Sequence, residues 1–319
     1  MNLLKLKFVC SSFISFLKQR HIRSVIGNIK YLYINIRIIF SKDPESLYIK
    51  KHELNRELLK TIIPLKNCVY DESPVDNYRI WVLWWQGYDA MPEIVKCTYN
   101  SICRMAGKDV VLITKDNISE YISIDSWIEE KVHKGFMKLP AFSDYIRAYL
   151  LFEYGGMWID STVLFTRQMP KWIYEEKFFT IYKDVNITNK YVAKGRWNVQ
   201  ILGTNKKHLQ LFEDMLYVFR EYWRKYNYIM DYLLVDYSID YSYNERKSVR
   251  ELIDSVPVTN TKMHTILSLF DLPYDSKKIN ELMKDTWLFK LTYKHKFINE
   301  VNGLPTFYKI IIRDNLPIK

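Results

Sequence analysis

The chain has 319 residues, of which 48% are hydrophobic and 26% charged, so it is long enough to bury one large core. It contains only 9 Gly and 10 Pro and no Gly/Ser-rich linker, repeat or low-complexity tract, which excludes a string of flexibly joined modules. The formal net charge of +11 favours anionic partners, but no recognisable nucleic-acid motif accompanies it, and we expect no nucleic-acid partner.

The positive charge is concentrated in residues 1–42. This segment has no acid, and it leaves 39 basic and 36 acidic residues, a net charge of +3, for the rest of the chain. Its eight basic residues are Lys5, Lys7, Lys18, Arg20, Arg23, Lys30, Arg37 and Lys42. Apolar residues are interleaved with them, which is typical of helices that lie on anionic membranes.

A membrane-spanning helix is not predicted in this segment. The most apolar run, residues 8–17, is ten long and contains three serines, whereas a span needs about 20 apolar residues. A small-residue cleavage site is also lacking, so we expect no secretory signal. Residues 1–42 therefore predict a basic amphipathic helical arm that attaches to a membrane surface, or alternatively packs against the protein.

Residues 79–121 predict the first half of an α/β sheet. The sequence RIWVLWWQG at 79–87 indicates a strand and its loop, and Ile94, Val95, Tyr99 and Ile102 indicate a helix. A second buried strand is expected at 109–114, followed by a turn at 117–121. The four cysteines form no CxxC pair and are expected to be small core residues in a reducing compartment; they are Cys10, Cys68, Cys97 and Cys103.

Residues 142–166 predict an amphipathic helix, a glycine stop and a short strand. Ser143 is the expected N-cap, and Asp144 and Arg147, three apart, share one face of the helix. Two glycines at 155–156 permit a left-handed turn, and the following strand brings Asp160 to its end, the ligand-facing edge of an α/β sheet. This pattern indicates a binding crevice. The alternative is a solvated surface ion pair on a helix that is followed by a glycine turn and a strand, an arrangement common in α/β proteins.

The C-terminal half carries weaker signals. Residues 197–203, WNVQILG, indicate a strand, and residues 231–241, DYLLVDYSIDY, indicate a tyrosine-rich helix. Asp231, Asp236 and Asp240 recur on that helix. We select Asp236 as an acceptor-side or catalytic acid, while a solvated helix face is the simpler interpretation of all three.

The pattern S-D-x-x-R-x-x-x-L-x-x-x-G-G-x-W-x-D at 143–160 resembles the signature of capsular polysaccharide synthesis proteins. These proteins belong with the glycosyltransferases whose sugar-binding region carries a DxD motif (family 32), and clostridial glucosylating toxins are similar here. Residues 79–87 also fit the first strand of this family. The resemblance is strong over residues 79–166, looser from 167 to 300 and absent before residue 43.

The resemblance implies a GT-A-like, Rossmann-related nucleotide-sugar-binding domain over residues 43–319, with a helix-rich C-terminal half. It implies retaining transfer of a hexose from a nucleotide diphosphate sugar to a capsular polysaccharide or lipid-linked oligosaccharide, at the cytoplasmic face of the cell membrane. The alternatives are a non-catalytic binding or assembly subunit and a hexose-phosphate transferase. Oligomeric state stays open.

The resemblance and the residue patterns described above together give a set of candidate site residues. The catalytic candidates are Asp144, Arg147 and Asp236. The donor-binding candidates are Trp84, Trp85, Gln86, Gly155, Gly156, Trp158 and Asn198. A divalent metal, Mn²⁺ or Mg²⁺, is expected on Asp160 and Thr162, although D-x-T offers a hydroxyl where D-x-D has a carboxylate. His264 and His295 are candidates to complete this metal site.

Overall fold

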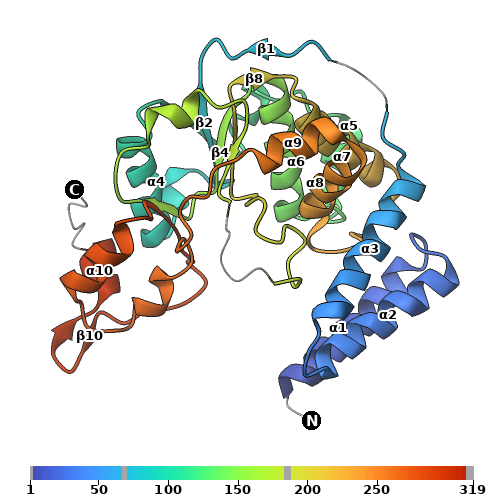
Figure 1. The fold of residues 1–319 in the computed structure, drawn as a ribbon, viewed down its shortest axis with the longest axis horizontal. Coiled ribbons are helices and arrows are strands. Elements are labelled where there is room, and N and C mark those ends of the chain that lie inside the picture. Colours follow the sequence, from blue (N-terminus) through green and yellow to red (C-terminus); the bar gives the residue numbers. More distant parts are fainter. Residues whose placement is uncertain (1–2, 67–69, 183–187, 314–319) are drawn as a thin grey trace.

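A five-stranded mixed sheet lies at the centre of the protein, in a computed structural model that describes residues 3–66, 70–182 and 188–313 (Figure 1). The strand order is β3-β2-β4-β7-β6; β2 is parallel to β3 and β4, and β7 is antiparallel to β4 and β6. The strands are β2 (Arg79–Leu83), β3 (Asp109–Ile113), β4 (Gly156–Ile159), β6 (Phe179–Thr180) and β7 (Ile201–Thr204).

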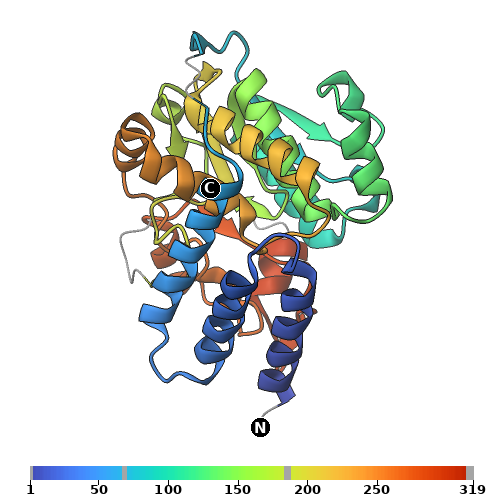
Figure 2. The ribbon, with the colours of Figure 1, turned by 90° about the vertical axis from the view of Figure 1, so that its right-hand side faces the viewer.

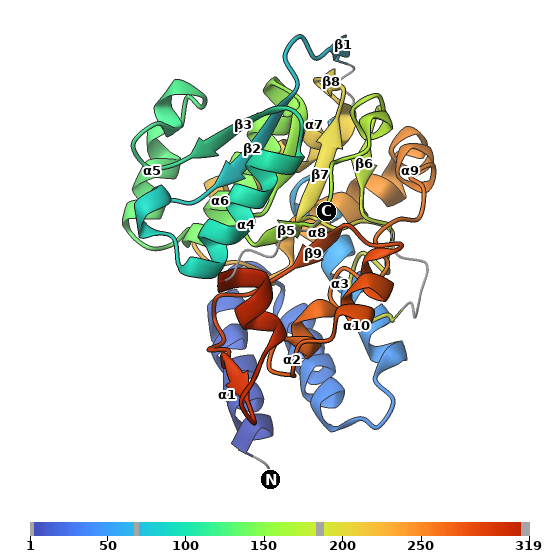
Figure 3. The same ribbon diagram turned by 90° about the vertical axis from the view of Figure 1, so that its left-hand side faces the viewer.

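Helices cover both faces of this sheet (Figure 3). Successive strand residues face opposite sides, so Trp81 and Trp158 enter the core under α6 and α7, while Ile80 and Met157 enter the core under α4. The helices are α4 (Glu93–Met105), α5 (Ser126–His133), α6 (Leu139–Glu153), α7 (Gln210–Lys225), α8 (Leu234–Glu245) and α9 (Lys247–Asp254). The α/β fold class is therefore confirmed.

The sheet reverses its strand order at β2. The chain runs from β2 through α4 to β3 on one side, then returns through α5 and α6 to β4 on the other side. The carboxyl ends of β2 and β4 consequently meet at a topological switch point, where α/β proteins bind ligands. The strand and helix predictions for residues 79–105 are confirmed, but β3 is a half-buried edge strand rather than a buried one.

Helix α6 begins before its predicted N-cap. Lys138 precedes the helix and Pro140 occupies its first turn, where a missing N–H costs nothing, so Ser143 lies inside the helix and the N-cap prediction is wrong. The glycine stop is confirmed, with φ of 64° at Gly155 and 82° at Gly156. A Cβ on Gly156 would lie 2.3 Å from the carbonyl oxygen of Arg79, so β2 and β4 can approach this closely only with glycine there.

A second layer of short elements follows the sheet. β5 (Val163–Phe165) pairs antiparallel with β9 (Leu288–Lys290), which brings the C-terminal region against the end of β4. The remaining strands are β1 (Ser73–Pro74), β8 (Lys206–Lys207), β10 (Glu300–Val301) and β11 (Leu304–Pro305). The remaining short helices are η1 (Tyr88–Ala90), η2 (Ile118–Glu120), η3 (Lys171–Tyr174), η4 (Ile266–Leu269), α10 (Ser276–Met283) and η5 (Lys309–Arg313).

Three N-terminal helices stand beside this core: α1 (Leu3–Gln19), α2 (Val25–Phe40) and α3 (Glu45–Ile62). Helices α1 and α2 form an antiparallel pair (Figure 2), and the proposed boundary at residue 42 falls between α2 and α3. Within the described residues, no helix is both long and apolar enough to cross a bilayer.

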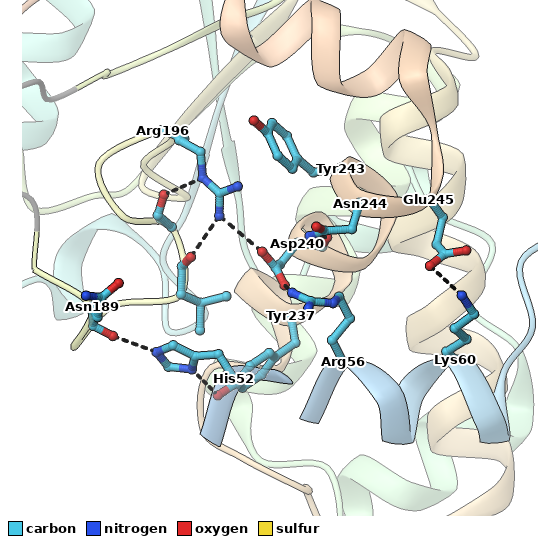
Figure 4. Close-up of polar contacts among 12 residues, drawn as sticks. His52, Arg56, Lys60, Asn189, Arg196, Tyr237, Asp240, Tyr243, Asn244 and Glu245 are labelled. Atoms are coloured by element: carbon cyan, nitrogen blue, oxygen red, sulfur yellow. Dashed lines mark hydrogen bonds and ion pairs between the residues drawn. The ribbon is translucent and has the colours of Figure 1, made fainter. Parts of the chain in front are cut away.

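Helix α3 joins the N-terminal helices to α8 through polar contacts (Figure 4). Arg56 Nη1 donates to Asp240 Oδ2 over 3.0 Å, and His52 Nδ1 lies 2.8 Å from the hydroxyl of Tyr237. Asp231 accepts hydrogen bonds from Tyr31 and Lys51 of the same helical layer. The interpretation that Asp231 and Asp240 lie on a solvated face is therefore wrong, because both carboxylates are paired and largely buried.

Of the three described cysteines, the prediction of a buried core residue is confirmed for Cys97 and wrong for the other two. Cys97 is buried in the apolar core between α4, β9 and η5, whereas Cys10 and Cys103 are exposed. Cys68 lies outside the described residues.

Candidate functional site

Asp160 is the centre of a charged cluster at the carboxyl end of β4. Its backbone N–H donates to the carbonyl of Gln200, which fixes it beside the start of β7. Its carboxylate accepts three side-chain hydrogen bonds: Arg147 Nη2 (3.1 Å) and Trp158 Nε1 (2.9 Å) on Oδ1, and Lys290 Nζ (2.8 Å) on Oδ2. Side chains of three elements, α6, β4 and β9, therefore meet at one carboxylate.

Helix α6 runs antiparallel to β4, so its N-terminal turns lie above Asp160. Asp144 and Arg147 share one helical face, as predicted, and Arg147 Nη1 donates to Asp144 Oδ1. The same guanidinium lies 4.8 Å from the ring centroid of Trp158. Trp158 is buried, so it packs beneath Arg147 and orients Asp160 through its indole N–H.

The carboxyl groups of the site differ in acidity. Burial raises the pKa of Asp144 to about 6 against the opposing effect of Arg147. Burial raises the pKa of Asp236 to about 7, although the indole N–H of Trp197 donates to its Oδ1 over 3.0 Å. At Asp160, burial acts in the same direction, but the cations of Lys290 and Arg147 outweigh it and hold the pKa below its usual value. Carboxyls with such separated pKa values can divide proton-transfer and charge-binding roles.

The two tryptophans after β2 lie in the loop and not in the strand, which ends at Leu83. Trp85 packs edge-on against Phe142 of α6, with ring centroids 5.5 Å apart. Trp84 packs edge-on against Tyr293, with centroids 5.4 Å apart. Gln86 is exposed in the following turn. One tryptophan thus faces the core and the other faces the segment after β9.

Three buried polar atoms near this edge lack a hydrogen-bond partner among the described residues. They are Trp84 Nε1, Arg147 Nε and Gln200 Oε1. Buried donors and acceptors are rarely left unpaired, because each costs about 1–3 kcal/mol. Arg147 and Gln200 both contact Asp160, and a polar ligand bound beside it would supply the missing partners.

The contacts of the other predicted site residues are with the surrounding backbone and neighbouring elements. Gly155 and Gly156 are at the opposite end of β4, where their conformations serve the packing against β2 and β8. Asn198 lies in the turn before β7, and its side chain accepts from the backbone N–H of Gln200. The backbone carbonyl of Thr162 accepts from Leu291, at the start of the β5–β9 pair.

The described residues do not assemble a divalent-metal site around Asp160. In the three described ranges, no group of three or more His, Cys, Asp or Glu side chains could hold a metal ion. His264 and His295 are both exposed, and His295 pairs with Asp271 over 3.4 Å. Both oxygens of Asp160 already accept hydrogen bonds from cationic or indole donors, so Asp160 and Thr162 as arranged here do not fit the ion.

Sequence reasoning missed two residues of this cluster. Lys290 ends β9, and its signal is the run Lys290, Lys294, His295 and Lys296, which contains no acid. Trp197, whose indole N–H donates to Asp236, lies at the start of the strand-like segment 197–203, and its contact joins residues 39 apart that no local spacing connects.

Comparison with known proteins places this site within a family. The family model described as "Capsular polysaccharide synthesis protein" matches residues 32–311. A relative named O-glycosyltransferase PaGT, from Phomopsis amygdali, is 26% identical over 153 residues, which cover 41% of this chain and 37% of that protein.

Among solved structures, the PaToxG glycosyltransferase matches with 12% sequence identity and a TM-score of 0.34, over 75% of this chain and 92% of that one. The chain spans well under half the length of the relative PaGT. The family match, in contrast, runs from α2 to η5 and includes every residue of the charged cluster. The chain therefore belongs to the capsular polysaccharide synthesis protein family.

Proposed function

We propose that the protein is a hexosyltransferase that takes a hexose from a nucleotide diphosphate sugar and transfers it to a surface polysaccharide or lipid-linked oligosaccharide. The observation that carries this proposal is the cluster of Asp144, Arg147 and Asp160 at the switch point between β2 and β4. Membership of the capsular polysaccharide synthesis family and the glycosyltransferase named among the relatives support it.

The side chains of the cluster suit a sugar nucleotide. Carboxylates accept hydrogen bonds from sugar hydroxyls, and a guanidinium presents its donors in a fixed fork. Arg147 has one such donor, Nε, still without a partner among the described residues. Trp84 lies on the same sheet edge and offers an aromatic face for a nucleobase. We assign the donor to this edge, in a GT-A-like arrangement.

Asp236 is the proton-transfer candidate of the site. Its carboxyl is close enough to Asp144 and Arg147 to feel both charges, and its pKa of about 7 leaves it poised near neutral pH. We propose that it faces the acceptor side, and that transfer retains the anomeric configuration as the family resemblance implies.

The N-terminal helix pair supports an acceptor at a membrane. Each helix leaves an apolar stripe in solvent: Leu6, Phe13, Ile14 and Leu17 on α1, and Val25, Ile26, Ile29, Tyr33 and Phe40 on α2. Exposed basic residues flank these stripes, namely Lys5, Lys7, Lys18, Lys30 and Arg37. Basic residues around an apolar face match an anionic lipid surface. We propose peripheral attachment to the inner face of the cell membrane.

A hydrolysis screen tests the proposed reaction. Purified full-length protein is incubated with a panel of nucleotide diphosphate hexoses, and free hexose and nucleotide are quantified beside the Asp160→Asn variant. We expect one donor to be turned over by the wild type and the variant to be slower by at least about tenfold. Release of hexose phosphate in place of hexose would indicate a hexose-phosphate transferase, and binding without turnover would indicate a non-catalytic subunit.

A further inference from the structure

The cation that faces Asp160 in this structure belongs to the protein itself. Lys290 Nζ lies 2.8 Å from Asp160 Oδ2, and the lysine side chain is 18% exposed. The pairing of Lys290 with Val163 in the β5–β9 ladder fixes the lysine backbone beside the D-x-T turn. Leu291 N–H then donates to the Thr162 carbonyl over 2.8 Å and extends this attachment by one residue.

A divalent ion on Asp160 would compete directly with this lysine. The carboxylate has about four lone-pair positions, and three of them already accept hydrogen bonds. Mg²⁺ binds carboxylate oxygen at about 2.1 Å, so an ion on Oδ2 would lie close to the ammonium of Lys290 and repel it. The ion would also need further ligands, and the described residues assemble no cluster that supplies them.

The segment that carries Lys290 is suited to bind phosphate. Residues 290–296 contain Lys290, Lys294, His295 and Lys296 and no acid. The contact of Tyr293 with Trp84 lays this segment along the carboxyl end of β2, so it borders the proposed donor edge. An ammonium has three donors, and only one of those of Lys290 is used by Asp160, which leaves two for phosphate oxygens.

We infer that Lys290 takes the place of a divalent metal at Asp160 and binds the diphosphate of the donor, so that donor binding is independent of metal. This inference rests on the proposed donor class. Asp160 orients the ammonium, and Lys294 and Lys296 add positive charge along the segment. The D-x-T sequence is then an adaptation to a lysine, because the second carboxylate of D-x-D has no metal to bind.

Calorimetric titration of the full-length protein with uridine, guanosine, adenosine and thymidine diphosphates tests this inference. Each titration is made in EDTA and again in Mn²⁺. We expect one nucleoside diphosphate to bind in EDTA, with a Kd that Mn²⁺ changes by less than about threefold. Binding seen only with Mn²⁺ would overturn the inference and leave the proposed function standing. No binding in either buffer would overturn both.

Substitutions distinguish a specific contact of Lys290 with the diphosphate from a general effect of positive charge. Lys290→Met should weaken binding in EDTA at least about tenfold, and Lys290→Arg, which keeps the charge, should recover most of that loss. Lys278→Met, at an exposed lysine of α10 outside this segment, is the matched control and should weaken binding by less than about threefold. Thermal melting confirms folding of each variant. Unchanged binding by Lys290→Met, or equal losses at both lysines, would contradict the assignment.

Discussion

Arg147 holds together two carboxylates that come from different elements. Its Nη1 donates to Asp144 and its Nη2 to Asp160, and the guanidinium is buried over the ring of Trp158. A lysine has a single terminal nitrogen and cannot keep both contacts in this planar geometry. The whole cluster therefore depends on the shape of the guanidinium as well as on its charge.

Substitution of Arg147 by lysine tests this dependence. We expect Arg147→Lys to lower donor hydrolysis at least about tenfold and to lower stability by about 1–3 kcal/mol, because one buried carboxylate loses its partner. Initial rates and denaturant unfolding provide the measurements. Arg104→Lys, an exposed arginine of α4, is the control. Equal effects of the two substitutions would show that the fork geometry is unimportant.

The buried carboxyl of Asp236 should make the stability of the protein depend on pH. Its folded-state pKa of about 7 is above the ordinary value, so the charged form opposes folding. The penalty is absent below the ordinary carboxyl pKa, grows as pH rises, and is complete above about pH 7. Asp236→Asn keeps an oxygen for the Trp197 N–H and cannot ionise. We expect it to be more stable than the wild type by roughly 1–3 kcal/mol at pH 8 and by much less at pH 5.

Urea unfolding of both proteins at the two pH values measures this difference. A stability difference that does not change with pH would mean that Asp236 is not held at a raised pKa by its surroundings. Donor hydrolysis is measured alongside, because loss of activity without loss of stability would support the proton-transfer role.

Residue-level predictions depended on local spacing. The pairing of Asp144 with Arg147 follows from a separation of three in a helix, and the sequence is sufficient for it. The contact of Asp160 with Lys290 joins residues 130 apart in the chain. Such a contact depends on which strand pairs with β5, and no local pattern in residues 280–296 indicates that pairing.

At the scale of elements, the α6–β4 junction sets the position of the cluster. Gly156 has φ of 82°, and a Cβ there would meet the carbonyl oxygen of Arg79 at 2.3 Å. Gly303 also has a positive φ, 75°, but a Cβ there would meet nothing within 4 Å. A side chain at Gly303 would therefore meet only the strain of the left-handed backbone, whereas one at Gly156 would meet that strain and a steric overlap as well.

Alanine substitutions at these glycines give a matched comparison. We expect Gly303→Ala to cost about 1 kcal/mol, from the left-handed conformation alone. Gly156→Ala should cost at least about 2 kcal/mol more, because β2 must move away from β4. Denaturant unfolding measures both. Equal losses of unfolding free energy in the two variants would mean that β2 and β4 can move apart at little cost, so that their close approach is not essential.

The presence of helices and strands was easier to predict from the sequence than the residues at which they begin and end. Short apolar runs indicated β2 and β4, which are buried over most of their length, and the helical spacing of apolar residues indicated α4. The start of α6 was misplaced, since Ser143 has the side chain of an N-cap but Pro140 already fits the first helical turn. The edge position of β3 depends on strand order, which is a property of the whole sheet.

At the scale of the molecule, the N-terminal helices have one side that contacts the rest of the protein and another side that is exposed to solvent. Their inner side reaches the core through Tyr31, which donates to Asp231, and through Gln19, which donates to the carbonyl of Met230. Their outer side leaves Leu17 63% and Ile26 68% exposed. The sequence predicted the basic amphipathic character of the segment but not its anchorage on the loop before α8.

Vesicle sedimentation tests whether the exposed side of α1 and α2 binds a membrane. We expect the protein to bind vesicles that contain phosphatidylserine and to be released by high salt, since Lys and Arg supply part of the attraction. The double variant Leu17→Gln with Ile26→Gln should weaken binding at least about tenfold. Ile298→Gln with Leu304→Gln removes two exposed apolar residues elsewhere and serves as the control. Equal binding by both double variants would contradict membrane attachment through α1 and α2.

We propose above that the donor binds at the carboxyl ends of β2 and β4. Hydrogen exchange of the full-length protein, measured by mass spectrometry with and without the nucleotide sugar found in the hydrolysis screen, tests it most directly. We expect the bound nucleotide sugar to protect residues 84–87, 142–148, 158–163 and 288–296 from exchange. Protection confined to other segments, with these four unchanged, would contradict it.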